Sequence, residues 1–325
     1  MKKYTVKRFT ENDYDNWNAF VSKAKNATFL FHRDFMDYHK DRFKDYSLLV
    51  YKNEKLVAIL PANKDGECVY SHQGLTYGGL VYGEKLKLAS VILVFKAILI
   101  YLNENGISKI RLNLIPSIYH SKPAEELNYA LFLAEAQLIR RQTLSVIDSS
   151  KPILISKGRQ EGIKKGILKR LEIKETNDFE EFWSKLLIPN LEKKYQSKPV
   201  HNLQEITSLK KHFPQNIRQF NVYDEGEIVA GATLFESENV IHSQYISAGK
   251  NKNKTGCLDF LYYHLIMGIF KDKKFFDFGT SNENQGKILN KGLSFWKESF
   301  GASTIVQDFY GVETANFSKL EDVLR

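Results

Sequence analysis

Several kinds of chemistry are nearly absent from this sequence. It has two cysteines among 325 residues, Cys68 and Cys257, so it supports neither a CxxC metal motif nor a disulfide framework. Two cysteines in unrelated contexts fit a reducing compartment, and we expect a cytoplasmic protein. His201 and His212 lack companions at metal-ligand spacing, so we expect no metal site.

Long hydrophobic runs are scarce as well. The most apolar stretch, residues 86–102, is short for a membrane span and carries Lys96 near its middle, where a charge is costly in hydrocarbon. We therefore predict a buried helix there and no membrane span. Residues 1–17 show no apolar core of a signal peptide, and no low-complexity tract predicts a disordered domain.

The composition is otherwise that of an ordinary globular protein with an excess of positive charge. Hydrophobic residues make up 43% and charged residues 26% of the chain, and its length allows two domains. The formal net charge of +9 favours anionic partners: phosphates, nucleotides, nucleic acid or a membrane surface. Charge alone does not choose among them.

The order of predicted elements is written twice along the chain. Residues 51–58 (YKNEKLVA) match residues 223–230 (YDEGEIVA), and positions 51 and 223 are 172 apart. At the same separation, residues 69–71 (VYS) stand opposite residues 241–243 (IHS). Each half reads as a helix, strands joined by a turn, a second helix and a final strand. We therefore predict two copies of one α/β (α+β) unit, divided into residues 1–150 and 151–325.

A basic segment connects the two halves. Residues 151–175 hold eight lysines and arginines against three glutamates, and we predict a linking helix over residues 157–171. Two interpretations stand: a solvated helix, which is the usual meaning of a charge run, or a positive wall that faces a phosphorylated ligand. On the second interpretation, Arg159 contacts the substrate.

A strand, a basic turn and a helix follow one another from residue 240. Residues 240–248 read as a strand, residues 249–256 (GKNKNKTG) as a basic turn, and apolar residues then repeat at helical spacing to Ile269. A helix start preceded by lysines offers unpaired N–H groups and positive charge to an anion. An ordinary solvated loop explains the same residues equally well. A further strand is predicted at residues 275–279.

Taken together, these features resemble the tandem GNAT acyltransferases of the Fem type. The resemblance covers most of the chain and is carried by residues 163–183 (IKKGILKRLEIKETNDFEEFW), 242–261 (HSQYISAGKNKNKTGCLDFL) and 275–302 (FFDFGTSNENQGKILNKGLSFWKESFGA). It looks most like the branch that acts on amino sugars in bacterial surface-polysaccharide synthesis, where SHQGLTYGGL (71–80) and PSIYHSKPAEE (116–126) also fit.

The resemblance implies two tandem GNAT-like domains, each a mixed sheet flanked by helices. The N-terminal domain would recognise the acceptor and the C-terminal domain would bind acyl-CoA. It also implies an N-acyltransferase that moves an acyl group from acyl-CoA to the amine of a dTDP- or UDP-linked amino sugar, for lipopolysaccharide, O-antigen or capsule synthesis. We expect a monomer or homodimer that does not use nucleic acid.

The resemblance further implies a set of coenzyme A contacts in the second half. The splayed fourth strand of a GNAT domain would place the backbone of Ile246, Ser247 and Ala248 against the pantetheine and acyl group. A typical GNAT pyrophosphate loop reads Gln/Arg-x-x-Gly-x-Gly/Ala, and residues 250–256 depart from it with lysines and asparagines. The diphosphate would then be held by Lys252, Lys254, Thr255 and Gly256. Ser281, Asn282 and Asn290 follow the strand at 275–279, where ligands gather in open α/β sheets.

Acyl transfer to an amine needs hydrogen-bond donors for the oxyanion and little help from a base. The candidate catalytic residues are His242, His72 and Asp277. Strand alternation places His242 and Gln244 on one face, although a lone core histidine explains His242 as well. Asp277 is flanked by apolar residues, so it is either a paired core carboxylate or a site group with a shifted pKa.

Acceptor contacts are expected mainly in the first half, where the glycine-rich turn after residue 70 is neutral. Arg33, in a loop-to-helix segment, could pair with a phosphate, and simple exposure explains it equally well. The predicted substrate contacts are Ser71, Gln73, Tyr77, Asn113 and Tyr119 in the first half, with Gln244, Tyr245, Glu283 and Arg159 in the second.

Two other functions stay open at this stage. A Fem-type transferase would take its donor from charged tRNA and modify a peptidoglycan precursor, which the net charge suits. Residues 244–289, however, leave no room for the helical arm that such proteins commonly insert. A non-catalytic GNAT-like binding protein would instead bind ligands without turnover.

Overall fold

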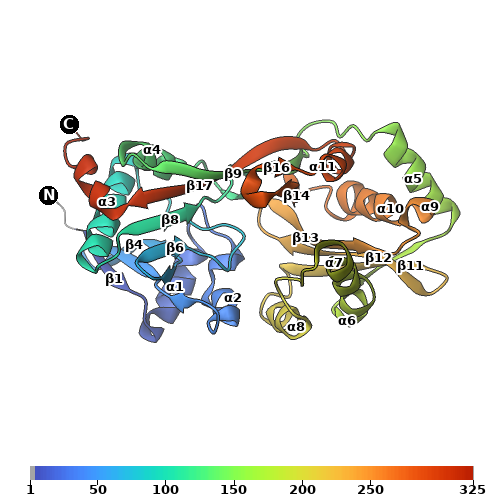
Figure 1. Ribbon diagram of the computed structural model, residues 1–325, viewed down its shortest axis with the longest axis horizontal. Helices are drawn as coiled ribbons and strands as arrows, with labels where there is room; N and C mark the ends of the chain where they lie inside the picture. The colour runs from blue at the N-terminus through green and yellow to red at the C-terminus, as the bar shows by residue number, and fades with distance from the viewer. Residues whose placement is uncertain (1–3, 325) are drawn as a thin grey trace. The chain divides into compact units, whose positions relative to one another are not determined.

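The computed structural model describes residues 4–324, which form two compact units (Figure 1). Unit 1 combines the residues up to Gln142 with those from Val306 onward, and unit 2 runs from Thr143 to Ile305. This division differs from the sequence division at residues 150 and 151, because β17 (Ser303–Glu313) pairs with β8 (Lys109–Asn113) of unit 1. Residues 1–3, which begin the stretch interpreted as lacking a signal peptide, lie outside the described residues.

Unit 2 is a mixed sheet in which one neighbouring pair of strands, β13 and β14, is parallel. Its strands run in the order β10 (Glu172–Thr176), β11 (Ile217–Asp224), β12 (Glu227–Glu236), β13 (Val240–Ala248), β14 (Phe275–Thr280) and β9 (Gln137–Asp148). The predicted strands at 240–248 and 275–279 are thus confirmed. A short hairpin, β15 (Asn282–Glu283) with β16 (Ile288–Leu289), follows β14.

Helices cover both faces of the unit 2 sheet. One face carries α5 (Lys157–Leu168), α9 (Lys252–Thr255) and α10 (Cys257–His264), and the other carries α6 (Glu180–Phe182), α7 (Ile188–Tyr195) and α8 (Leu203–His212) (Figure 1). Helix α11 (Lys291–Glu298) follows the short hairpin. The helix predicted to reach Ile269 is confirmed, since a π-helical turn at Leu265–Ile269 continues α10.

Unit 1 contains the same kinds of element in two smaller sheets. One sheet has the order β1 (Tyr4–Arg8), β3 (Leu48–Lys52), β4 (Lys55–Leu60) and β7 (Val81–Tyr82); in the other, β8 lies between β17 and β6 (Cys68–Ser71), followed by β5 (Asn63–Asp65) and β2 (Lys44–Asp45). The helices are α1 (Tyr14–Val21), α2 (Arg33–Met36), α3 (Leu88–Glu104) and α4 (Glu126–Leu133). Each unit buries its own hydrophobic core.

The apolar run at residues 86–102 forms the buried helix predicted from it, α3. Its residues Phe95 and Leu99 lie in the core of unit 1, while Lys96 reaches the rim and pairs with Glu321 at 3.6 Å. No helix within residues 4–324 is long and apolar enough to cross a membrane.

The internal repeat is also visible in the residue-by-residue pairing of the strands in the two units. The β3–β4 hairpin shifts register between Val50 and Tyr51, and the β11–β12 hairpin shifts between Val222 and Tyr223, again 172 positions apart. Such bulges are specific local features, so the same bulge in both hairpins strongly supports duplication. The parallel pairs match too, because β6 begins at Cys68 opposite Lys109 and β13 begins at Val240 opposite Phe275.

The two copies differ by an insertion in one strand. Tyr82 pairs with Ala58, and Ala248 pairs with Ala230, so the separation falls from 172 (58 to 230) to 166 (82 to 248). The difference, 172 − 166, is six residues. The strand that is continuous as β13 is therefore split in unit 1 into β6 and β7, with residues 72–80 between them. This split divides the sheet of unit 1.

Candidate functional site

Strands β13 and β14 of unit 2 pair only at their beginnings. Their parallel register covers Val240 to His242, and β13 then continues to Ala248 beside β12 alone. A register shift between Thr233 and Leu234 leaves Gln244 as an extra residue on β13. The two strands therefore part just beyond His242, and β13 keeps one unpaired edge there.

The free edge of β13 can be assigned residue by residue. The Gly249 N–H donates to the Val229 carbonyl at 2.9 Å, so Gly249 faces β12, and so does Ser247 two residues earlier. Ala248 and Ile246 consequently face the free edge. The Ala248 carbonyl accepts from the Asn190 side chain at 3.0 Å, so the free edge offers the Ala248 N–H and both backbone groups of Ile246. The predicted backbone role of Ser247 does not fit this geometry, and its hydroxyl bonds Asn190 and Leu186 instead.

Two predicted catalytic residues meet where the strands part. His242 Nδ1 lies 2.9 Å from Asp277 Oδ2, and the Gly279 N–H donates to the other carboxylate oxygen at 2.7 Å. The Asp277 side chain is 1% exposed and that of His242 is 13% exposed. Because a carboxylate accepts, Nδ1 carries a proton, and Nε2 is the acceptor when the ring is neutral. The pair has the geometry of a histidine oriented for proton transfer.

A buried lysine holds the backbone turn that follows Asp277. Lys297 on α11 is 4% exposed, and its Nζ donates to the carbonyls of Gly279 at 2.9 Å and Thr280 at 2.7 Å. Burial lowers the pKa of Lys297 to about 8, against the opposing attraction of the Asp277 carboxylate. Gly279 has φ +71°, and a Cβ there would lie 3.3 Å from His242 Cε1. Lysine and glycine together hold the turn that orders Asp277 and His242.

The bulge on β13 changes which side chains share a face. The Ser243 hydroxyl contacts Tyr262 of α10, whereas Tyr245 packs against Trp183 on the opposite side of the sheet. Strand alternation, from which the sequence analysis placed His242 and Gln244 on one face, is therefore interrupted by the bulge at Gln244. Tyr245 is buried, with its hydroxyl 2.6 Å from His201 Nδ1, and burial raises its pKa to about 12. Gln244 Oε1 is buried without a hydrogen-bond partner among the described residues.

The predicted diphosphate turn is a helical turn packed under α5. Thr255 is 5% exposed; its hydroxyl donates within the turn and accepts the Cys257 N–H at 3.3 Å. A Cβ on Gly256, at φ +68°, would lie 2.0 Å from the Gly162 carbonyl of α5. These contacts give Thr255 and Gly256 structural roles. Lys252 is exposed, and it adds to the effect of burial in lowering the pKa of Lys194 on α7.

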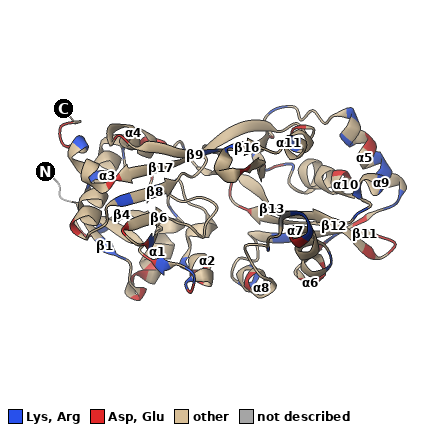
Figure 2. Ribbon diagram, in the orientation of Figure 1, with Lys and Arg blue, Asp and Glu red and all other residues tan. Residues whose placement is uncertain are grey.

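Arg159, predicted to contact substrate, instead ties α5 to α10. Its guanidinium donates to Asp259 at 2.6 Å, and the Trp296 indole N–H reaches the same carboxylate at 3.3 Å. Burial raises the pKa of Asp259, and Arg159 opposes that shift. The predicted helix 157–171 ends at Leu168, because Arg170 has φ +56° and the Leu171 N–H bonds the Gly166 carbonyl. Lysines remain exposed on α5 at positions 157, 164 and 165, and the ribbon of this helix carries several basic segments (Figure 2).

The residues predicted at the end of β14 mostly support the local backbone. Asn282 Oδ1 accepts from the Thr143 N–H at 2.6 Å, and Asn290 caps α11 by accepting from the Leu293 N–H at 3.1 Å. Asn290 also donates to Glu283 at 2.9 Å. Ser281 is different, because its buried hydroxyl has no partner among the described residues. Of this group, Ser281 and the exposed Glu283 keep groups that a ligand could use.

The residues predicted to contact the acceptor in unit 1 form the interior of the loop at 71–80. Ser71 accepts from the Gly79 N–H at 2.9 Å, and the Asn113 side chain donates to the Leu75 carbonyl at 3.5 Å. Tyr77 donates to Thr28 at 3.1 Å, and its ring lies 4.6 Å from that of Tyr119 in a tilted arrangement. Gln73 is held by Asn63 through two bonds, at 2.6 and 2.9 Å. Most of this set is used for packing.

His72 belongs to the same packed loop. It is 4% exposed, accepts the Gly74 N–H at 3.1 Å and lies with its ring 5.1 Å from that of His39. Burial lowers the pKa of His72 to about 3, with smaller contributions from His39 and Arg33. The ring is enclosed, and its contacts with Gly74 and His39 give it a packing role within unit 1.

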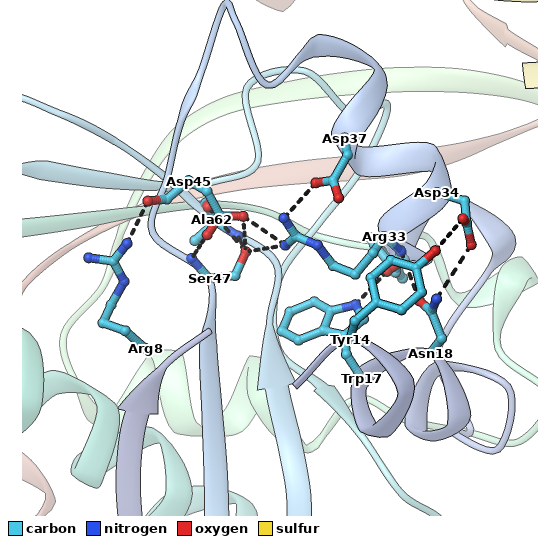
Figure 3. A network of polar contacts seen from close by, with 11 residues as sticks. Arg8, Tyr14, Trp17, Asn18, Arg33, Asp34, Asp37, Asp45, Ser47 and Ala62 are labelled. Carbon is cyan, nitrogen blue, oxygen red and sulfur yellow. Dashed lines mark hydrogen bonds and ion pairs between the residues drawn. The ribbon is translucent and has the colours of Figure 1, made fainter. Parts of the chain in front are cut away.

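Arg33 is also committed within unit 1. Figure 3 shows its guanidinium between Asp37 and Asp45, at 2.6 and 2.7 Å, with Ser47 at 3.2 Å. The side chain is 4% exposed and packs 4.0 Å from the Phe9 ring. Both carboxylates hold the guanidinium inside unit 1, and its buried Nε has no partner among the described residues, so the pairing with phosphate considered from the sequence does not fit.

Sequence reasoning missed the importance of Lys297. A signal was present, since Ser294 and Lys297 are three positions apart on one face of α11, and both are buried. The same helix holds a misprediction in the other direction: the usual burial of aromatic side chains favours a core position for Phe295, yet it is 67% exposed.

Comparisons with known proteins support the fold. No protein-family model matches the sequence, and no curated protein matches it. In structure the chain is similar to FemX, with a TM-score of 0.67, 10% identity and coverage of 98% of this chain and 99% of FemX. It is also similar to L-PGS from Bacillus licheniformis, with a TM-score of 0.57, 13% identity and coverage of 88% and 93% of the two chains.

A third similar structure is a tandem GNAT protein from the clavulanic acid biosynthesis pathway, with a TM-score of 0.50, 10% identity and coverage of 96% and 99%. At these identities the likeness concerns the fold. It confirms the predicted architecture of tandem GNAT-like domains, each with a mixed sheet flanked by helices. The narrower resemblance to amino-sugar acyltransferases gains no support from it.

Proposed function

We propose that this protein is an acyltransferase that forms an amide, with the reaction at the free edge of β13 in unit 2. The observation that carries the proposal is the His242–Asp277 pair, ordered at the point where β13 and β14 part. A parted strand pair gives an acyl group room beside unpaired backbone N–H groups, and an oriented histidine gives the amine a proton acceptor.

The proposed reaction uses these groups in one sequence. The acceptor amine attacks the carbonyl carbon of the acyl group, a C–N bond forms, and the negative oxygen lies against the open Ile246 N–H. Nε2 of His242 takes the proton that the amine loses, while Asp277 stabilises the resulting imidazolium. The bond to the leaving group then breaks, and that group receives the proton held by the His242 imidazolium, which returns the histidine to its neutral form. Lys297 holds the carbonyls of Gly279 and Thr280 and so keeps Asp277 in place.

For the two substrates, the finer proposal is an acyl-CoA donor and a nucleotide-linked amino sugar as acceptor. Exposed Lys252, near Lys194, supports an anionic donor at the end of β13. Thr255 and Gly256 do not add to that support, because α5 covers them.

A second candidate is transfer of an aminoacyl group from tRNA, as in the Fem-type alternative. The specific observation in its favour is the close packing of α5 over the start of α10, where Gly162 and Gly256 touch. A donor without a diphosphate tail does not need that position, and a net charge of +9 suits a polynucleotide. Binding to tRNA that weakens steeply with salt would favour this candidate.

One experiment tests the proposal under both donors. The full chain is assayed with acetyl-CoA by thiol release, and with aminoacyl-tRNA by transfer of labelled amino acid, against a panel of amine acceptors. His242→Asn is expected to lower kcat about 100-fold with whichever donor is used, the scale of a general base. His72→Asn, which changes the buried histidine of unit 1, serves as the matched control and is expected to leave kcat within about twofold.

Equal losses in the two variants, both still folded by thermal melting, would contradict the role of His242. Binding of either donor without any turnover by the unchanged protein would instead support the third possibility, a GNAT-like binding protein.

A further inference from the structure

Unit 1 contains a cavity that the proposed reaction does not use. It has a volume of about 980 Å³ and is lined by α1, the β3–β4 hairpin and the segment from Gly83 to Ser90 that opens α3. All of its lining residues belong to unit 1, whereas the His242–Asp277 pair belongs to unit 2. Ligand pockets commonly measure 300–1,000 Å³, so the volume suits a small molecule.

The lining of this cavity is divided into an apolar part and a positive rim. Phe20, Leu56 and Val57 supply apolar surface. Five lysines surround it, against two glutamates, and the rim consists of Lys23, Lys52, Lys55, Lys85, Lys87, Glu54 and Glu84. One of these acids, Glu84, already pairs with Lys122, which lies outside the cavity. The remaining charge strongly favours an anion.

The start of α3 adds to the positive field at the same place. This helix has 17 residues, yet its N-cap is Lys87, without a side-chain cap bond, and its first turn holds no acidic residue. Helix starts usually recruit an acid or a capping oxygen to satisfy the first N–H groups. Here those groups open beside Ser90, which lines the cavity, so a bound anion would satisfy them.

The repeat shows how unit 2 treats the corresponding place. Lys52 and Ser90 line the cavity in unit 1, and their counterparts at separations of 172 and 166 are Asp224 and Gly256. In unit 2 both counterparts contact α5 or its end: Asp224 pairs with Lys169 at 3.4 Å, and Gly256 packs on Gly162. Helix α5 therefore fills in unit 2 the position that stays open in unit 1.

We propose that this cavity binds a small amphipathic anion. Its phosphate or carboxylate would lie at the start of α3 between Lys85 and Lys87, and its apolar part would lie on Phe20 and Leu56. The same chemistry is available from a free phosphate monoester or fatty carboxylate and from the headgroup region of an anionic lipid. The proposal is independent of the chemistry at His242.

The test is titration of the full chain with dodecyl phosphate, below the concentration at which it forms micelles, followed by calorimetry. We expect saturable binding that weakens at least tenfold in Lys85→Glu/Lys87→Glu and weakens with added salt. Lys40→Glu/Lys44→Glu is the matched control, because it makes the same charge change on exposed lysines of unit 1 outside the cavity. Its affinity is expected to stay within twofold of the unchanged protein.

Two further arms separate the sources of the ligand and keep the proposal open to failure. Inorganic phosphate should bind far more weakly than dodecyl phosphate, since it lacks the apolar part. Vesicles with 30% phosphatidylglycerol identify a lipid source if the Lys85/Lys87 variant loses binding to them; binding of dodecyl phosphate alone identifies a free ligand. No binding of either, or equal loss in both double variants, overturns the proposal. If the variant fails to fold, Lys23→Glu, two residues after the end of α1, replaces it.

Discussion

The two units use the same strand in different ways. In unit 2, β13 runs unbroken from Val240 to Ala248 and parts from β14 after His242. In unit 1, six extra residues split the equivalent strand into β6 and β7, and the loop between them fills the space beside β8: the Gly78 N–H donates to the Asn113 carbonyl at 2.7 Å. One copy keeps a free strand edge, and the other closes it with its own chain.

This difference explains why equivalent positions in the two units differ in whether a ligand can reach them. Ser71 and Ser243 are 172 positions apart, but Ser71 holds the Gly79 N–H in a buried loop, while Ser243 lies on the strand that forms the open edge. Duplication therefore provides two copies of a scaffold, and a short insertion decides which copy can admit a ligand between its strands. The cavity in unit 1 lies away from that closed position, beside the hairpin turn and the start of α3.

The largest expected effect tests the closure of unit 1. A Cβ at Gly78 would lie 1.6 Å from the Ser71 carbonyl oxygen, so Gly78→Ala forces the loop out of position. We expect a loss of about 3 kcal/mol in the stability of unit 1, the upper end for overpacking. Hydrogen exchange of β8 amides, compared with β14 amides, measures the loss in unit 1 alone.

Gly83→Ala is the control for that variant, because the nearest atom to a Cβ at Gly83 is 3.9 Å away. Its counterpart in unit 2, Gly249→Ala, has a nearest atom at 3.7 Å and provides the same control there. Both are expected to change stability by less than about 0.5 kcal/mol. If Gly78→Ala behaved like them, the loop would not be the closure described above.

Much of this architecture follows from local patterns in the sequence. The matching hairpins at 51–58 and 223–230, the strand before the basic turn and the apolar run of α3 all form as predicted, because each pattern is decided by neighbours in the chain. The pairing of His242 with Asp277 was not predicted as a contact, although both were named. Their contact follows from the parallel register of β13 and β14.

The rest depends on contacts that no local pattern reveals. The bulge at Gln244 moves Tyr245 to a face that alternation did not give it, and the six-residue insertion becomes visible only once strand registers are known. The packing of α5 rests on Gly162 and Gly166, which lie against Asp259 and Phe260 of α10. The basic segment, which the sequence allowed as a positive wall facing a phosphate, therefore forms helix α5. This helix packs on Gly256, one of the residues predicted to hold the diphosphate.

A second comparison concerns buried titratable groups, and in unit 2 the group is Lys297. Its pKa is about 8 in the folded protein, below the ordinary value of 10.5, because burial disfavours the charge. Between these two pH values the unfolded chain holds the proton more tightly, so unit 2 should gain stability as the pH rises from 8 to 10.5. At about 1.4 kcal/mol per pH unit, the gain is at most about 3 kcal/mol.

Lys297→Met should remove that slope. The measurement is urea denaturation at pH 8, 9 and 10, with Lys291→Met, an exposed lysine of the same helix, as the control. A slope unchanged in Lys297→Met would show that another group titrates there.

Unit 1 has the opposite window, at acid pH, through His39 and His72. Burial lowers the pKa of His39 to about 4 and that of His72 to about 3, below the ordinary value of 6.5. Below pH 6.5 these two histidines bind protons in the unfolded chain but not in the folded protein. Unit 1 therefore loses stability as the pH falls toward 4. At pH 5 the loss is about 2 kcal/mol for each ring.

His39→Phe, which keeps a ring between Tyr38 and Phe43, should halve the acid slope measured by hydrogen exchange of β8. The control is His212→Phe, at an exposed position of unit 2, which should not change that slope. Equal acid slopes in β8 and β14 would mean that the two units unfold together, and the independence of their cores would then have to be given up.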